Sequence, residues 1–529
     1  MGRNITTTAA ALHEPLAVTI TGDAVTVGDY VRVEASGAGR RAVDGLSLAA
    51  QNTGTGVTAL AGLGATAHVA ATNYGGSVQP GRLLAVLGNG NVACLHAGDG
   101  TSASNALTCR IYSPLKAQVA VVAVTAAASI SVFRVFKLGA NNFAVCWVET
   151  SALKMAVYSN AGAVVSAAIT VATLGSGAMS RWNAAALANG DLLLAYDKTA
   201  TGGMFFSRYN ASGALQGAET TVEAAVAADY VCVLPLAAGG FWVYYYRSTA
   251  TAAYKFARYN AAGVLQGALT TVFTGSANLT AGLSENYAIE LSNGNVALVD
   301  PTTGTVSAVR LYDGAGTFLA TVTNNTGLGS GLGPNNTMPR AKSGGGFYIA
   351  TFNGLIAQYD NAGNRLVSGT APTALPGSNQ GLLIERVATG PVLFYTNFDS
   401  SSTGSVSAMA WDASLTAEAT ALTVQATTTT TFGLWAELMP CGLLAYTFCS
   451  TAVTGVSVHG RLAPQAASLL GLAITAGSDG QAVSVATAGR WRANQTMPAA
   501  SFDRRSSVPV GCKAIITGGT SAVLLGIVA

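Results

Sequence analysis

The sequence predicts an all-β protein built from repeats, and three observations predict it. A Gly-centred turn between two apolar runs recurs at a period of about fifty residues. An aromatic residue followed by a polar turn recurs in phase with it. The composition agrees, because the chain has 62 glycines and only 10% charged residues. Short β segments at such a period are typical of a β-propeller, in which each repeat is one blade.

The Gly turns mark the hairpin between the first two strands of each repeat. Asn-Gly between alternating apolar runs is a strong hairpin signal, because a type I′ turn needs positive φ at both central residues. The first strand therefore leads into the turn and the second leaves it. The turns are centred on Gly90, Gly139, Gly190, Gly240, Gly294, Gly346, Gly390 and Gly442.

The aromatic signal marks the third strand, and the polar turn after it leads into a fourth strand rich in Thr and Val. The clearest copies are RYNASGALQGAETTV from Arg208 and RYNAAGVLQGALTTV from Arg258. Four strands per repeat is what a propeller blade requires. The aromatic residues are Tyr112, Tyr158, Tyr209, Tyr259, Tyr312, Tyr359 and Trp411.

The eighth repeat reaches a third strand near residues 456–462 and has no obvious fourth strand of its own. Closing a ring removes its exposed strand edges, so residues 65–72 are expected to supply the missing strand. We therefore predict an eight-bladed β-propeller over residues 65–462. Seven blades is the alternative, because the interval from Gly346 to Gly390 is the shortest of the set.

The two ends of the chain lie outside the repeats, and each contains alternating strands. The motif GDYVRV occupies residues 28–33, LGLA residues 470–473 and GQAVSV residues 480–485. Together they resemble small β modules of tailed-bacteriophage virion proteins, in which these motifs run continuously. The resemblance implies that residues 1–64 and 463–529 form one small β-sandwich or barrel-like base domain, with the propeller inserted. It also implies a location in the virion and contacts with other virion proteins.

The repeats themselves resemble those of large bacterial surface and adhesin-like proteins. This chain often has Asn or Ser where those repeats have acidic turn residues, as at Ser159, Asn210 and Asn260. The departure argues against a calcium role. The polar residues are expected to stabilise Asx-type turns instead.

The sequence offers no catalytic motif, and we predict neither an enzyme nor a metal or cofactor. His13, His68, His96 and His459 lack metal-ligand or triad spacing. A glycosidase would need a pair of carboxylates. The acids in predicted loops are scattered, and solvated positions are expected for Asp99, Glu149, Asp197, Glu285 and Asp399.

Charge and hydropathy exclude other classes. The net charge is +3 without a dense Lys/Arg cluster, which argues against nucleic-acid binding. No signal peptide opens the sequence, and secretion by that route is not expected. Residues 117–133 are too short and too often interrupted by polar residues for a membrane span, and they fit two consecutive strands instead. Of the seven cysteines, Cys94 and Cys109 could face each other across adjacent strands, and whether they are bonded stays open.

Candidate ligand-binding residues are placed on connections between strands, because such loops are exposed on a rigid scaffold. The aromatic run at residues 241–246 is expected to fill the space between blades rather than to stack on a carbohydrate. The loop 323–339 offers amides that can both donate to and accept from sugar hydroxyls. The candidates are Arg181 and Trp182 in the connection 170–183, Asn324, Asn325, Asn335 and Asn336 in the loop 323–339, and Asp399.

These observations predict a non-enzymatic phage structural protein, a tail-associated appendage or surface decoration that exposes its propeller to a host-surface glycan or protein. A bacterial adhesin and a polysaccharide-degrading tailspike are the alternatives. The apolar chain end at residues 522–529 is expected to be buried against the base domain or a neighbouring subunit, and a homo-oligomer is expected.

Overall fold

The computed structural model describes the larger part of the chain, which divides into two compact units. One unit comprises residues 1–60, 439–444 and 461–529, and the other residues 61–438 and 445–460. The predicted domain boundaries stay a prediction. The described residues are 16–19, 30–33, 39–41, 65–67, 82–97, 106–112, 118–126, 130–174, 181–198, 202–247, 251–275, 288–300, 308–322, 337–351, 353–373, 381–386, 390–398, 404–412, 414–417, 422–427, 431–438, 444–450, 456–462, 469–473, 482–486, 489–493, 513–516 and 522–528.

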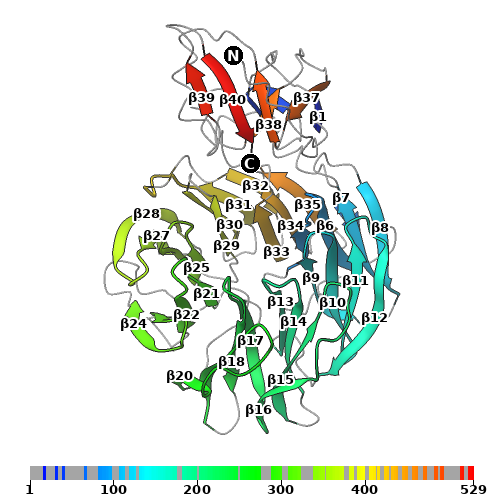
Figure 1. The fold of residues 1–529 in the computed structure, drawn as a ribbon, viewed down its shortest axis with the longest axis vertical. Helices are drawn as coiled ribbons and strands as arrows, with labels where there is room; N and C mark the ends of the chain where they lie inside the picture. Colours follow the sequence, from blue (N-terminus) through cyan, green and yellow to red (C-terminus); the bar gives the residue numbers. More distant parts are fainter. Residues whose placement is uncertain are drawn as a thin grey trace, which may run out of the picture. The chain divides into compact units, whose positions relative to one another are not determined.

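Within the described residues, the larger unit is a series of eight antiparallel sheets of four strands (Figure 1). The first four sheets are β5 (Leu84–Val86), β6 (Val92–Ala97), β7 (Leu107–Tyr112) and β8 (Gln118–Thr125); β9 (Ile130–Leu138), β10 (Asn142–Glu149), β11 (Ala152–Ser159) and β12 (Val164–Thr173); β13 (Trp182–Ala186), β14 (Leu192–Asp197), β15 (Gly203–Tyr209) and β16 (Thr220–Ala224); and β17 (Ala228–Pro235), β18 (Phe241–Arg247), β19 (Ala253–Tyr259) and β20 (Thr270–Thr274).

The next three sheets keep the same order of strands. They are β21 (Ala288–Glu290), β22 (Val296–Asp300), β23 (Ala308–Tyr312) and β24 (Phe318–Val322); β25 (Thr337–Ala341), β26 (Phe347–Thr351), β27 (Asn353–Tyr359) and β28 (Arg365–Thr373); and β29 (Gly381–Arg386), β30 (Gly390–Phe398), β31 (Gly404–Ala410) and β32 (Leu422–Thr427).

The last sheet takes its fourth strand from the other end of the series. It consists of β33 (Thr431–Leu438), β34 (Leu444–Ser450), β35 (Val456–Leu462) and β4 (Ala65–Ala67). In its register, Ser457 lies opposite Thr66. The expectation that a strand near residue 65 completes the last sheet is confirmed.

The two periodic signals of the sequence are neighbours in the sheet of β17–β20, which shows how they are related. Phe241 after one Gly turn lies opposite Tyr259 in the ladder, and their rings stack at 5.1 Å. Gly240 has φ of +88°, and a Cβ there would lie 2.5 Å from the carbonyl oxygen of Tyr259. A side chain is therefore excluded by both the backbone conformation and the close approach of the third strand. Phe347 and Tyr359 repeat this stacked pair at 5.2 Å.

The apolar core lies between consecutive sheets, and one strand contributes to two layers of it. On β18, Trp242, Tyr244 and Tyr246 pack with residues of β22, whereas Phe241 and Tyr245 pack with residues of β14. Side chains alternate between the two faces of a strand, so each sheet is buried on both faces. The expectation that this aromatic run fills the space between sheets is confirmed.

The first strand of each sheet is innermost, and these strands contact one another in sequence around a common centre (Figure 1). The contacts run β5–β9, β9–β13, β13–β17, β17–β21, β21–β25, β25–β29 and β29–β33, and β33 also contacts β5.

The polar residues after the aromatic signal stabilise turns through their own side chains. Oδ1 of Asn260 accepts hydrogen bonds from the backbone N–H groups of Ala262 and Val264, at 3.0 and 2.9 Å. Asn210 and Asp360 make the same pair of bonds to the residues two and four positions on. The expected Asx-type turns are confirmed, and Asn and Asp serve equally well as acceptors.

The same turns are held by the preceding sheet. The guanidinium of Arg208 on β15 donates to the carbonyl of Ala261 in the turn of the next sheet at 2.6 Å, and to Gln216 O in its own sheet at 3.3 Å. Arg258 on β19 likewise donates to Gly314 O in the following sheet at 3.4 Å. The arginine before the repeated tyrosine therefore links consecutive sheets.

We expect Arg208→Ala to lower the free energy of unfolding by about 1–2 kcal/mol, because a charged donor to two carbonyls is lost. The side chain is partly exposed, so water can replace part of the interaction. Urea unfolding followed by circular dichroism measures the change. Arg208→Lys keeps the charge but not the planar guanidinium, so its free energy of unfolding should lie between those of the parent and Arg208→Ala. If Arg208→Lys kept the stability of the parent, the positive charge alone would be enough, and the geometry of the guanidinium would have no role.

The repeated tyrosines of the third strands are buried, and their burial predicts that the protein loses stability at high pH. Burial raises the pKa of Tyr112, Tyr158 and Tyr259 from 10 to about 12. In the unfolded chain these phenols ionise near pH 10, whereas the folded protein keeps them protonated. Their contribution to stability is therefore complete below pH 10 and is lost as the pH rises through about 12.

Tyr259→Phe tests this expectation, because it removes one ionisable group and keeps the ring. The variant should match the parent near neutral pH and retain more stability between pH 10 and 12. Thermal unfolding measured across this range gives the comparison. If parent and variant lose stability in parallel, the phenol of Tyr259 does not drive the transition.

The described strands of the smaller unit form two sheets, and one of them combines strands from both ends of the chain. Its strand order is β1-β37-β36-β2-β3, and the other sheet is β38-β40-β39. The N-terminal β2 pairs with the C-terminal β36, with Tyr30 opposite Leu472. The bounds are β1 (Leu16–Thr19), β2 (Tyr30–Val33), β3 (Gly39–Arg41), β36 (Leu469–Ala473), β37 (Ala482–Ala486), β38 (Gly489–Ala493), β39 (Lys513–Ile516) and β40 (Ala522–Val528).

Several sequence-based expectations differ from the structure in detail. Gly390 is the first residue of β30, opposite Arg386, and thus lies just after its hairpin turn rather than at the centre. The loop predicted to end at residue 339 ends earlier, because β25 begins at Thr337. Trp411 follows β31 and forms an isolated bridge with Ala417.

The segment 117–133 forms parts of β8 and β9, as expected. In the described part of the chain, no helix has the length and apolarity needed to cross a bilayer.

Cys94 and Cys109 are free and buried, so the open question of their bonding is answered: no disulfide joins them. Cys109 lies opposite Leu95 and Cys94 lies opposite Arg110. The two cysteines are therefore one position out of register and belong to opposite faces of the ladder.

Candidate functional site

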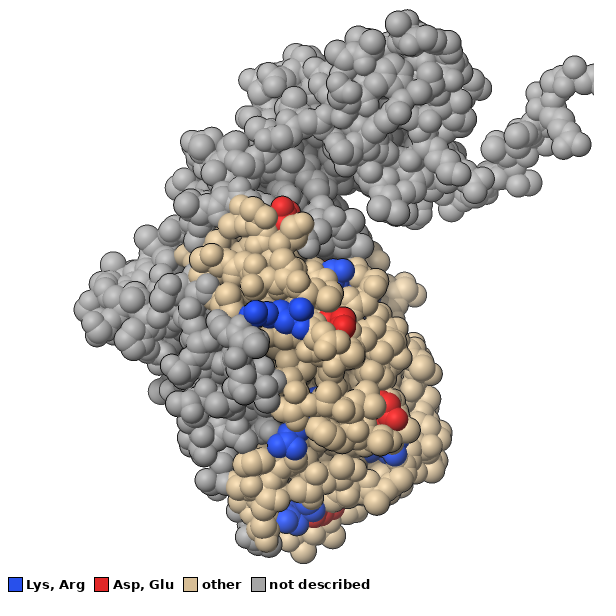
Figure 2. Space-filling model, turned by 90° about the vertical axis from the view of Figure 1, so that its left-hand side faces the viewer, with Lys and Arg blue, Asp and Glu red and all other residues tan. Residues whose placement is uncertain are grey.

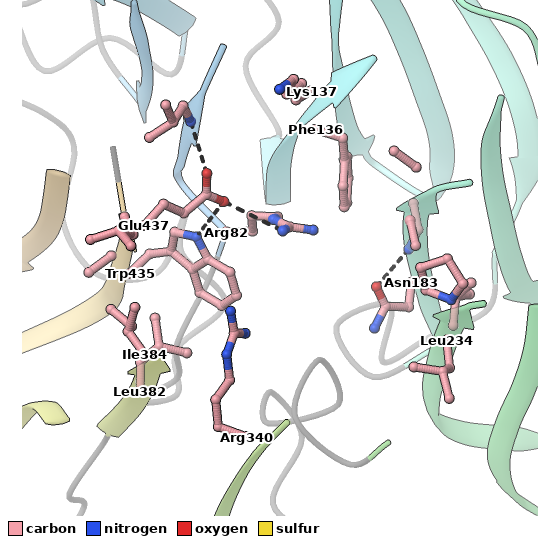
Figure 3. Close-up of a pocket in the computed structure, with 18 of the residues that line it drawn as sticks. Arg82, Phe136, Lys137, Asn183, Leu234, Arg340, Leu382, Ile384, Trp435 and Glu437 are labelled. Atoms are coloured by element: carbon pink, nitrogen blue, oxygen red, sulfur yellow. Dashed lines mark hydrogen bonds and ion pairs between the residues drawn. The ribbon is translucent and has the colours of Figure 1, made fainter. Parts of the chain in front are cut away.

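A cavity of about 530 Å³ is lined by the first strands of the sheets and the residues next to them. Each of the eight first strands, or the residues directly next to it, contributes to the lining: β5, β9, β13, β17, β21, β25, β29 and β33. Figure 3 shows side chains from opposite sides pointing into it. No other described feature brings all eight sheets to one place, and a site here depends on the whole series.

One wall of the cavity is a network centred on Glu437 of β33. Its carboxylate accepts hydrogen bonds from Val86 N at 2.9 Å and from the indole Nε1 of Trp435 at 3.2 Å. Nη2 of Arg82 lies 3.4 Å from Oε1 of the same carboxylate. These contacts join the last sheet to the first, and they hold Glu437 in one position (Figure 3).

Arg82 is held between two aromatic rings in the same network. Its guanidinium lies 5.3 Å from the ring centre of Phe136 and 5.2 Å from that of Trp435. The planar cation therefore contacts π faces from β9 and β33 as well as its carboxylate.

Arg340 of β25 points up toward Trp435 and the rest of this network in Figure 3. Its side chain is exposed to the cavity, but the surrounding protein displaces most of the bulk water. This desolvation lowers the pKa of Arg340. The charges of Glu385 and Glu437 raise that pKa, and the charge of Arg82 lowers it. The guanidinium stays protonated at neutral pH, since an arginine pKa lies far above this range.

The ligand-binding candidates Arg181 and Trp182 are not on an exposed connection, and that premise is wrong. Trp182 is the first residue of β13 and is fully buried, with the Arg134 guanidinium 4.7 Å from its ring centre. Arg181 forms an ion pair with the buried Asp197. The connection is also shorter than expected, because β12 extends to Thr173. A ligand-binding role for the pair stays a prediction.

Two acids expected in loops lie at strand ends, where they are paired. Asp197 ends β14 and is fully buried, and Glu149 ends β10 with its Oε1 2.8 Å from Nζ of Lys154. Hydrogen bonds, first that from Lys154, lower the pKa of Glu149. The expectation of a solvated position is therefore wrong for Asp197, whereas the side chain of Glu149 is 22% exposed and stays partly solvated. Within the described residues, no group of three or more His, Cys, Asp or Glu side chains could hold a metal.

The remaining candidates lie outside the described residues: Asn324, Asn325, Asn335, Asn336, Asp399, Asp99 and Glu285.

Figure 2 shows the charged side chains of one face, where Lys and Arg are interspersed with Asp and Glu.

The cavity residues Arg82, Arg340, Trp435 and Glu437 were not predicted from the sequence. They come from three sheets and share no local motif. A usable signal exists, namely a charged residue within the first apolar strand of a repeat, as in TMPRA at residues 337–341 and FGLWAEL at residues 432–438.

The fold is that of a β-propeller, distantly similar to varied propeller proteins. No protein-family model matches the chain, and no curated protein sequence matches it. Similar solved structures include BamB from Moraxella catarrhalis, with 12% identity over 73% of this chain and 97% of that one, at a TM-score of 0.36. The Dos1 propeller has 10% identity over 73% and 92% of the two chains, at a TM-score of 0.44. The polysaccharide lyase Uly1 has 10% identity over 85% and 100%, at a TM-score of 0.41. These similarities concern the fold alone.

Proposed function

We propose that the eight four-stranded sheets are the blades of one closed, eight-bladed propeller. Two observations support this count. The first strands contact one another in a cycle that returns from β33 to β5, and all of them line the same cavity. The pairing of β4 with β35 supports closure by the two ends of the propeller segment.

We further propose that the chain ends form a small base domain into which the propeller is inserted. The support is the five-stranded sheet that combines strands from residues 16–41 with strands from residues 469–486. Neither segment has enough apolar surface to fold alone. The propeller then leaves and re-enters one folded body.

We propose that the protein is a non-enzymatic structural component of a phage virion, a tail-associated appendage or surface decoration. The base domain would contact other virion proteins, with homo-oligomers as the expected assembly, and the propeller would be available to a host surface. The observation that carries this is the pairing of β2 with β36, because these strands hold the separated motifs GDYVRV and LGLA. The motifs are continuous in the virion modules that the sequence resembles, and their strands are adjacent here.

A bacterial adhesin is the second candidate, favoured by the repeats themselves. The turns at Asn210 and Asn260 form without acidic residues at those positions, and Arg208 and Arg258 link consecutive sheets. These contacts account for the recurring form of the repeats. They would be the same in an adhesin and in a virion appendage, so the adhesin rests on the resemblance of the repeats.

The location of the protein in purified particles tests the proposal. A label fused to the chain should appear at one position of the virion in electron micrographs. The free protein should compete with particles for adsorption to host cells. Absence from particles together with exposure on a bacterial surface would favour the adhesin. Release of soluble sugar from capsule or lipopolysaccharide would favour the polysaccharide-degrading tailspike.

Host contact through the loop 323–339 is tested in the same particles. Replacing Asn324, Asn325, Asn335 and Asn336 by alanine should slow adsorption and change stability by no more than about 0.5 kcal/mol. Adsorption at the parental rate would exclude this loop as the receptor contact and move the search to other connections.

A further inference from the structure

The cavity holds positive charge that its acids do not neutralise. Glu437 is already bound to Arg82, Trp435 and Val86 N. Glu385, near Arg340, accepts two hydrogen bonds from Ser343, at 2.6 Å from its backbone N and 3.0 Å from its hydroxyl. Within the described residues, neither Arg340 nor Lys137 has a hydrogen-bonded or ion-paired acid. Two cations are therefore available to a ligand.

The rest of the wall is mainly apolar. Leu382 and Ile384 of β29 lie beside Trp435, and Leu234 lies across the cavity (Figure 3). A volume of about 530 Å³ falls within the range of small-molecule sites. Apolar walls with a few polar groups that fix orientation are what such sites present.

We propose that this cavity binds a small organic carboxylate, with the carboxylate on Arg340 and an apolar body against β17 and β29. A guanidinium offers two parallel N–H donors that match the two oxygens of a carboxylate. An inorganic anion would leave the apolar wall uncovered, and a neutral molecule would give the guanidinium no hydrogen-bonded anion. The proposal is independent of where the protein resides, so its failure would leave the proposed function unaffected.

The full-length protein can be titrated with 2-naphthoate, its neutral analogue 2-naphthamide and inorganic sulfate by isothermal calorimetry. Naphthoate should bind at least about tenfold more tightly than the amide, because a charge-assisted hydrogen bond contributes on this scale. Arg340→Gln should weaken naphthoate binding by a similar factor and remove the preference over the amide. Lys137→Gln should weaken it less, since a lysine is a point charge without the fork.

Lys342→Gln is the matched control, because it removes one positive charge two residues away at a position that does not line the cavity. Its affinity for naphthoate should equal that of the parent, and thermal unfolding verifies that all variants are folded. Equal binding of acid and amide by the parent, no binding of naphthoate, or an unchanged affinity in Arg340→Gln would overturn the proposal. Sulfate binding as tight as that of naphthoate would overturn the assignment to an organic acid.

Discussion

Trp242→Ala should lower the free energy of unfolding by about 3–5 kcal/mol. The indole is fully buried on β18 and stacks on Phe256 at 4.3 Å. It also meets the edge of Tyr312 in the next sheet at 6.3 Å. Truncation leaves a cavity at the boundary of two sheets, where neither can close it without moving the other. Urea unfolding followed by far-UV circular dichroism measures the loss.

Phe318→Ala is the control for aromatic truncation as such. Phe318 contacts the same Tyr312 ring at 5.7 Å, and it is 51% exposed. Its removal should change stability by less than about 1 kcal/mol, because little apolar area is returned to water. If Trp242→Ala lowered the free energy of unfolding as little as Phe318→Ala, the side chains between the sheets β17–β20 and β21–β24 would not be tightly packed around Trp242.

The repeat architecture was predictable because its signals are local. A Gly turn and an aromatic residue about twenty positions later are register partners in one hairpin ladder, as Phe241 and Tyr259 are. Positive φ at the turn is common to Gly139, Gly190, Gly240 and Gly294. An added Cβ would meet a third-strand carbonyl at Gly240, whereas it would meet nothing within 4 Å at the other three. The missing fourth strand was predictable for the same reason, since every other repeat supplied one.

The cavity was not predictable, because its residues are close only after all sheets have been placed. Arg82 and Glu437 meet across almost the whole series, with a separation of 355 residues. The burial of Trp182 has a similar cause. Its position shortly after the Gly- and Ser-rich segment 174–180 indicates a connection, whereas packing against Arg134 of the preceding sheet makes it the start of β13. Tertiary contacts decided both cases.

A disulfide between β4 and β35 should stabilise the larger unit strongly, since these strands join its two ends. Thr66 lies opposite Ser457 in the antiparallel register. Cross-strand partners have Cβ atoms close enough for a disulfide after substitution of both by cysteine. Such a bond closes a loop of roughly 390 residues, for which the chain-entropy model gives on the order of 5 kcal/mol. The double variant Thr66→Cys/Ser457→Cys should therefore unfold at a clearly higher temperature when oxidised than when reduced.

The control for this variant changes the register by one residue. Thr66→Cys with Val458→Cys places the two thiols on opposite faces of the ladder, because Val458 lies opposite Ala65. It should form no intramolecular bond and show no dependence of its unfolding temperature on reductant. The native cysteines Cys94, Cys109, Cys146 and Cys232 are free and buried, which limits their exchange with the engineered pair. Equal crosslinking in both variants would mean that β4 slides along β35. Failure of Thr66→Cys/Ser457→Cys to crosslink would mean that β4 does not pair with β35. The last sheet would then have three strands, and its third strand would have an unpaired edge.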